Sequence, residues 1–170
     1  MPTSKDIVTI KTMLRPLIGH EAWGASLGLG SFLLLEFGDT VTVPMETVEP
    51  LIKGAWHLWL YSAAWRIEVA GVVQAASGDA PEHKEQLRHA IKILNGLRLE
   101  AVTISPAFGD TRFQFANATA LRTFSMASHE PDKPHWRLTF PDGRILTLGP
   151  ASNWGLYSAT GERSGGSELA

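Results

Sequence analysis

The sequence predicts a single α+β domain, mainly antiparallel β-sheet, with two helices and an internal pseudo-twofold duplication of an α-plus-hairpins unit. Two segments carry apolar residues at helical spacing, and the stretches after them are short apolar runs separated by Gly, Asp and Pro. The second half also repeats the apolar pattern of the first. A unit of about 75–80 residues buries little surface alone, so the two sheets are expected to share one core, as a sandwich or a partly closed barrel.

The predicted domain covers residues 1–160, with half one at about 4–77 and half two at about 79–156. The remaining residues, 161–170, are small and polar and are expected to form a flexible tail.

The first predicted helix runs from Ser4 to Leu17. Ser4 suits the N-cap position, and Asp6 lies near the positive end of the helix dipole. Pro16 and Gly19 end the helix. The apolar side chains of one face are Ile7, Ile10, Leu14 and Leu17.

The second predicted helix lies within residues 78–96. Asp79 is its expected cap, Pro81 falls early in its first turn, and Gly96 closes it. Its apolar stripe consists of Leu87, Ala90, Ile91 and Leu94.

Strands are predicted wherever short apolar runs lie between turn residues. The step Pro141-Asp142-Gly143 is a strong turn signal, because proline presets φ and glycine accepts the left-handed conformation. The expected strands lie near 21–28, 31–37, 40–45, 55–61, 64–69, 71–76, 97–104, 111–116, 119–126, 135–140, 143–148 and 152–156.

The evidence for duplication is an alignment of the chain with itself. At an offset of 77 residues, Ile10 falls on Leu87, Met13 on Ala90, Leu14 on Ile91, Leu17 on Leu94 and Gly19 on Gly96. At an offset of 78, residues 35–39 fall on 113–117, and at 80, Trp56, Leu58 and Leu60 fall on Trp136, Leu138 and Phe140. The alternative is that two unrelated helix-plus-hairpin segments align by chance.

Alternation in the second half predicts which strand face is buried in the first half. Phe113, Phe115, Trp136, Leu138 and Phe140 are expected to point inward, and Arg112, Gln114, Arg137 and Thr139 outward. The same alternation, applied to the aligned strands of the first half, predicts that the buried residues there are Leu35, Phe37, Trp56, Leu58 and Leu60. It leaves an aromatic stripe on the outer face of the first half, formed by Leu34, His57, Trp59 and Tyr61.

Such a stripe needs a cover, since each aromatic ring buries about 150–250 Å² when it is covered. The cover is a helix or the tail of the same chain, a second subunit or partner protein, or an apolar or planar ligand. Arg66 and Glu68 are expected on the same outward face, as a surface ion pair or with Arg66 as a recognition anchor.

Composition excludes several classes of function. With 15 basic and 17 acidic residues, the net charge of −2 gives no basic surplus for nucleic acid. The absence of cysteine excludes disulfides, thiolate catalysis and cysteine-bound metals. Lys5, Asp6 and Lys11 interrupt any secretory signal, and no run approaches about 20 apolar residues, so no membrane association is expected and a cytoplasmic location is predicted.

No catalytic residue, metal ligand or cofactor is predicted. The glycines in residues 24–32 are read as a hairpin turn, because no helix follows to bind a phosphate. Glu36 is read as a polar residue on an outer face. A cluster of His129, Glu130, Asp132 and His135 is conceivable, but its segment is typical of a polar connection stiffened by proline.

The sequence alone therefore does not identify an activity. The leading hypothesis is a non-enzymatic binding or protein-interaction domain, with a homodimer as one form, that acts through Leu34, His57, Trp59, Tyr61 and Arg66. The alternative is a small-molecule-binding barrel or an enzyme with its site in the cleft between the two halves.

Overall fold

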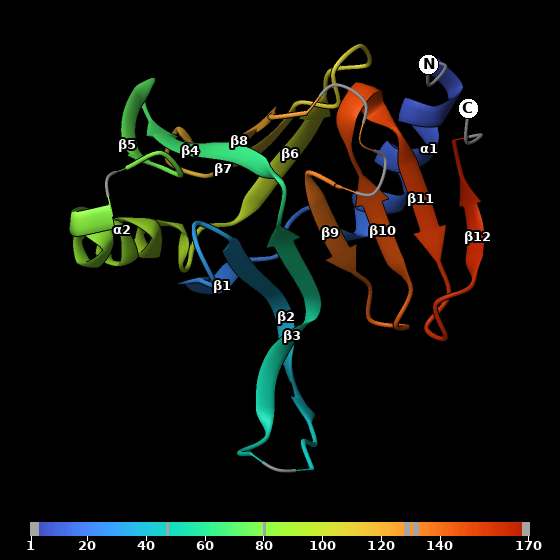
Figure 1. Ribbon diagram of the computed structural model, residues 1–170, viewed down its shortest axis with the longest axis horizontal. Coiled ribbons are helices and arrows are strands. Elements are labelled where there is room, and N and C mark those ends of the chain that lie inside the picture. The colour runs from blue at the N-terminus through green and yellow to red at the C-terminus, as the bar shows by residue number, and fades with distance from the viewer. Residues whose placement is uncertain (1–3, 47, 80, 128–129, 131–132, 168–170) are drawn as a thin grey trace.

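The computed structural model describes residues 4–46, 48–79, 81–127, 130 and 133–167. It confirms the predicted class, because two antiparallel sheets make up most of the fold (Figure 1). The first sheet has seven strands in the order β1 (Ala22–Leu27), β2 (Leu33–Val43), β3 (Leu51–Leu60), β9 (Trp136–Thr139), β10 (Ile145–Leu148), β11 (Trp154–Tyr157) and β12 (Arg163–Gly166). The second has five, in the order β5 (Val72–Ala76), β4 (Ala63–Val69), β8 (Thr119–Ser125), β7 (Thr111–Phe115) and β6 (Leu99–Ile104).

Both predicted helices are present. Helix α1 (Ser4–Leu14) continues into a 3-10 turn, and α2 (Lys84–Ala90) lies between two 3-10 turns. Asp79 does not cap the second helix as predicted; its Oδ2 accepts the backbone N–H of Ala76 at 3.0 Å, at the end of β5. The helical segments pack against strands of both sheets, α1 against β6, α2 against β5, and the turn after α2 against β1.

The core lies between the inner faces of the two sheets. Phe37 of β2 and Phe115 of β7 stack there with ring centroids 6.4 Å apart and an interplanar angle of 5°, and both side chains are fully buried. The predicted inward phase is confirmed in both halves by the buried residues Leu35, Phe37, Trp56, Leu58, Leu60, Phe113, Phe115, Trp136, Leu138 and Phe140.

The chain exchanges strands between the two sheets. After β3 it crosses within two residues, Tyr61 and Ser62, to β4, which pairs with β8 in the other sheet. After β8 it crosses back to β9, which pairs with β3. Each sheet therefore contains strands from both halves of the sequence.

Backbone hydrogen bonds join the two halves at equivalent positions. Gly19 N donates to Leu99 O at 2.8 Å, and Gly96 N donates to Ala22 O at 2.7 Å, so donors and acceptors are each 77 residues apart. Both glycines have positive φ, at 97° and 81°. These pairs agree with the first part of the alignment, and the duplication itself remains a prediction.

The last part of the alignment, at the offset of 80 residues, matches the sequence of β3 with that of β9, and these two strands are neighbours in one sheet. Residues Leu58 and Leu138, three positions into the matched segments, are cross-strand partners in β3 and β9 of one sheet. By their order in the chain, the pair of strands equivalent to β2 and β3 is β7 and β8. In the first pair Leu58 lies opposite Leu35, and in the second pair Leu121 lies opposite Phe113.

The predicted strands 31–37 and 40–45 form one strand, β2, with a bulge. The Gly38-Asp39 step resembles a turn in sequence, but Gly38 adopts φ 72° inside the strand, and its carbonyl accepts a hydrogen bond from Trp23 Nε1 at 2.9 Å. Opposite the bulge, a Cβ at Gly54 would lie 2.6 Å from the Phe37 carbonyl oxygen, so only glycine fits there.

The prediction of a flexible tail from residue 161 is wrong for residues 163–166, which form β12 beside β11. The glycines that suggested mobility allow this close pairing. A Cβ at Gly166, where φ is 143°, would lie 2.5 Å from the Trp154 carbonyl oxygen.

The aromatic pair between the sheets gives a stability prediction. We expect Phe115→Ala to lower the free energy of unfolding by about 3–5 kcal/mol, because it removes apolar contacts and leaves a cavity. Val73→Ala, at an exposed position of β5, is the control and is expected to change it by less than about 0.5 kcal/mol. Urea unfolding of the purified proteins measures both, and equal effects would contradict the assignment of the core.

A buried histidine lies where the chain returns to the first sheet. His135 is fully buried, its Nδ1 lies 3.3 Å from the Gly109 carbonyl oxygen, and its Nε2 has no hydrogen-bond partner among the described residues. Burial lowers the pKa of His135 below its ordinary 6.5, against smaller opposing effects of the Gly109 hydrogen bond and the Asp110 charge. Folding therefore favours the neutral form of this imidazole.

This burial predicts a pH dependence. Below the ordinary pKa of 6.5 the unfolded chain binds a proton at His135 that the folded chain excludes, so stability falls as pH drops from that value toward the lowered pKa. We expect the unfolding free energy of His135→Asn to change less between about pH 7.5 and about pH 5.5 than that of the wild type. Urea unfolding at the two pH values tests this, and parallel changes in the two proteins would contradict it.

Candidate functional site

The predicted stripe residues Leu34, His57, Trp59 and Tyr61 lie together at β2, β3 and the end of β3, and all are half-buried. Trp59 and Tyr61 pack edge to face with ring centroids 5.2 Å apart. Phe32, which the sequence reading did not include, completes the group at 6.2 Å from Trp59 and 5.1 Å from Tyr61. Leu34 lies directly opposite Trp59 on β2. The first half therefore carries an aromatic cluster, defined here as Phe32, Leu34, Trp59 and Tyr61.

The neighbouring strand partly covers this cluster. Arg137 of β9 lies opposite Trp59, and its guanidinium carbon is 5.3 Å from the centre of the Tyr61 ring, within the range of a cation–π contact. The indole Nε1 of Trp59 is buried and has no hydrogen-bond partner in the described part of the chain. Packing among the described residues thus leaves the polar atom of this side chain unsatisfied.

His57 forms a pair with Glu36 beside the aromatic cluster. Glu36 Oε1 is 2.6 Å from His57 Nδ1, and Glu36 Oε2 accepts the backbone N–H of Gly54 at 2.7 Å. Glu36 is on the outer position predicted for it, yet it is buried. A carboxylate that holds an imidazole in this way can orient it as a general acid or base, and covalent catalysis would also require a nucleophile beside it. No hydroxyl group of the described residues is hydrogen-bonded to His57, and Glu36 links the His57 ring to the backbone of β3 at Gly54.

Arg66 does not join the stripe. It is in β4, so it lies in the five-stranded sheet and pairs with residues of β5 and β8. Its Nε binds Glu68 at 2.5 Å, and its guanidinium lies over the ring of Phe124 at 4.8 Å. Strand alternation predicted its outward direction, but the crossing at Tyr61 and Ser62 moves it to another sheet.

The β2–β3 hairpin extends beyond the body of the protein (Figure 1). Residues 40–43 and 51–55 form this projecting arm, in which Val43 pairs with Leu51 and Thr42 with Ile52. Exposed large apolar side chains concentrate on the arm and its connecting loop: Val41, Met45, Val48, Leu51 and Ile52. Sequence reasoning missed the arm because it began the second strand at 55. The signal was present in the β-branched run Val41-Thr42-Val43 and the pair Leu51-Ile52 on either side of Pro44 and Pro50.

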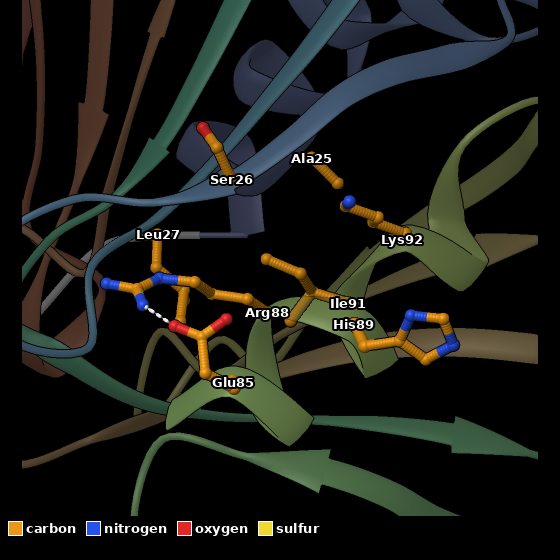
Figure 2. Close-up of a pocket in the computed structure, with 8 residues that line it drawn as sticks. All are labelled: Ala25, Ser26, Leu27, Glu85, Arg88, His89, Ile91 and Lys92. Carbon is orange, nitrogen blue, oxygen red and sulfur yellow. Dashed lines mark hydrogen bonds and ion pairs between the residues drawn. The ribbon is translucent and has the colours of Figure 1, made fainter. Parts of the chain in front are cut away.

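The surface of the protein contains several shallow hollows. One of 390 Å³ is between β1 and the second helical segment, where Arg88 reaches toward Leu27 and binds Glu85, and the His89 ring points away from both (Figure 2). This hollow is lined by residues of both predicted halves, whereas the interior between the two sheets is filled around the stacked rings of Phe37 and Phe115.

The structure contains no group of three His, Asp or Glu residues arranged to hold a metal ion within its described ranges. His129 and Asp132, part of the conceivable cluster in the sequence, lie outside these ranges. Among the described helices, none has the length and apolar character needed to cross a membrane.

The chain was compared with protein families, with curated proteins and with solved structures. No match was found in any of the three comparisons. A functional proposal therefore depends on the chemistry and geometry of the surfaces described above.

Proposed function

We propose that this protein is a protein-interaction domain that self-associates through its β2–β3 hairpin, with the projecting arm and the aromatic cluster as the contact surface. The observation that carries the proposal is the concentration of exposed apolar side chains on the arm. Of the described large apolar residues that are strongly exposed, five lie between positions 41 and 52. Soluble proteins seldom leave such a group in water unless it forms an interface.

The arm carries apolar groups on both faces. Strand β3 alternates without a bulge, so Leu51 lies on the same face as Trp59, and Ile52 lies on the opposite face. A flat contact would cover only one of these side chains. A partner that packs around the arm and contacts both of its faces would cover both side chains.

The arm also has free strand edges. Strand β1 pairs with β2 only up to Phe37, and β9 pairs with β3 only from His57 to Leu60. Beyond these points the outer backbone groups of the hairpin have no strand partner among the described residues. Such edges accept another strand readily unless charge or proline blocks them, and Lys53 is the only charged residue in 40–43 and 51–55.

A second copy of the chain suits these features. Twofold symmetry brings identical surfaces together, so one arm can supply the strand edge and apolar face that the other lacks. At the base of the arm, Trp59, Tyr61 and Arg137 are residue types that commonly anchor protein interfaces. The arm would thus supply apolar area, and the aromatic cluster would supply anchoring contacts.

The direct test places a charge on the arm. Ile52 and Val72 are each 61% exposed, so Ile52→Glu and Val72→Glu introduce the same charge at equally accessible strand positions. We expect Ile52→Glu to shift the protein from dimer to monomer, weakening association at least about tenfold, because it would bury an unpaired carboxylate. Val72→Glu should remain dimeric. Gel filtration with light scattering measures the mass, and circular dichroism confirms that both variants are folded.

A second variant tests the aromatic cluster. We expect Trp59→Asp to remain folded, since Trp59 lies outside the inter-sheet core, and to associate more weakly than the wild type. Analytical ultracentrifugation over a concentration series measures the dissociation constant. A wild-type chain that is monomeric at micromolar concentration would disprove the self-association proposal, whatever the variants do.

A further inference from the structure

The outer face of the five-stranded sheet carries a row of three arginines. Arg66 of β4 lies directly opposite Arg122 of β8, which in turn lies directly opposite Arg112 of β7. Neighbouring strands are about 4.8 Å apart, so the row spans roughly 10 Å on a rigid scaffold. These residues are far apart in sequence, and only the pairing of the strands brings them together.

One buried carboxylate organises part of the row. Glu68 binds Arg66 Nε at 2.5 Å through Oε1 and lies 3.2 Å from Arg122 Nε through Oε2. Phe124 supports the Arg66 guanidinium from one side, at 4.8 Å. The side chains of Arg66 and Arg122 remain 39% and 34% exposed, so they are held in place and can still reach a ligand.

The charges in this region do not balance. Like charges directly opposite each other destabilise a sheet, and here two such pairs occur in succession. Arg112 has no ion-pair partner within the described residues, and Asp110 accepts the backbone N–H of Ser125 at 3.0 Å. The three guanidinium groups exceed the carboxylates of Glu68 and Asp110 by one positive charge.

A hollow adjoins the row. It has a volume of 430 Å³, within the usual range for small-molecule sites, and its polar and aromatic lining comprises Arg112, Arg122, Asp110, Thr103, Ser105 and Phe124. The Arg66 guanidinium stands over Phe124 at its margin. The hollow thus combines guanidinium donors, hydroxyl groups and an aromatic ring on one sheet face.

We propose that this hollow binds a small phosphorylated ligand, whose phosphate groups contact Arg112 and Arg122 and extend toward Arg66. Guanidinium groups bind phosphate oxygens through paired, charge-assisted hydrogen bonds. Glu68 contacts only the Nε atoms of Arg66 and Arg122, and two linked phosphates can present oxygens to the remaining donors of neighbouring guanidiniums at once. The size of the hollow favours a small molecule over an acidic protein surface. This site is separate from the β2–β3 hairpin and does not depend on self-association.

The test measures binding of inorganic pyrophosphate by isothermal titration calorimetry. We expect wild-type protein to bind it with a dissociation constant of about 1 mM or lower, and more weakly as salt is raised. Arg112→Gln should weaken binding about tenfold, since Arg112 is exposed and its loss removes charge-assisted contacts without disturbing the fold. Arg88→Gln is the matched control, because it removes the same charge from the separate hollow of Figure 2 and should leave affinity unchanged.

Three results would overturn the proposal. The first is no heat of binding with wild-type protein at about 10 mM pyrophosphate. The second is an equal loss of affinity in Arg112→Gln and Arg88→Gln, which would indicate attraction to positive charge in general. The third is tight binding of a polyglutamate peptide without binding of pyrophosphate, which would assign the row to an acidic protein partner.

Discussion

The fold depends on one constraint: neither sheet can be completed by one half of the chain. Strand β4 crosses to pair with β8, and β9 crosses back to pair with β3. The crossings close the two inner faces over a common core, with Phe37 and Phe115 in contact at its centre. The hydrophobic contribution to stability is roughly proportional to the apolar area removed from water, so each half stabilises the other by covering its apolar face. The outer faces remain available, and the candidate sites lie on them.

Much of this fold was predictable because strand alternation is a local property. Side chains two residues apart share a face, so the inward phase of β2, β3, β7 and β9 was readable from residue types alone. The bulge at Gly38 was not, because a glycine inside a strand and a glycine in a turn look alike in sequence. Pairing was also hidden, since the choice of β8 as the partner of β4 depends on the packing of the whole chain. Strand β12 was missed for a similar reason, as its stability comes from β11 and not from its own composition.

The candidate binding surfaces were predictable where they lie on adjacent strands of one hairpin. The stripe formed by Leu34, His57, Trp59 and Tyr61 lies within two adjacent strands joined by one hairpin, and alternation located it correctly. Phe32, at the end of a loop, and Arg137, in a strand distant in sequence, also contact Tyr61 of this stripe. Alternation within one strand cannot predict contacts with such distant residues. Arg66 was assigned to the wrong surface because the phase was extended through the crossing at Tyr61 and Ser62. Its true neighbours, Arg122 and Arg112, follow more than 40 residues later in the sequence.

The exchange of strands also limits how this chain can be divided. A cut in the connection between the halves, near residues 77–79, would leave each fragment with strands whose hydrogen-bonding neighbours belong to the other fragment. Neither fragment could bury its own apolar face, and neither could be lost or transferred to another protein as an independent module. Substitutions are therefore expected to be tolerated best at the hairpin tips and the outward-facing positions, where a change affects recognition and leaves the shared interior intact.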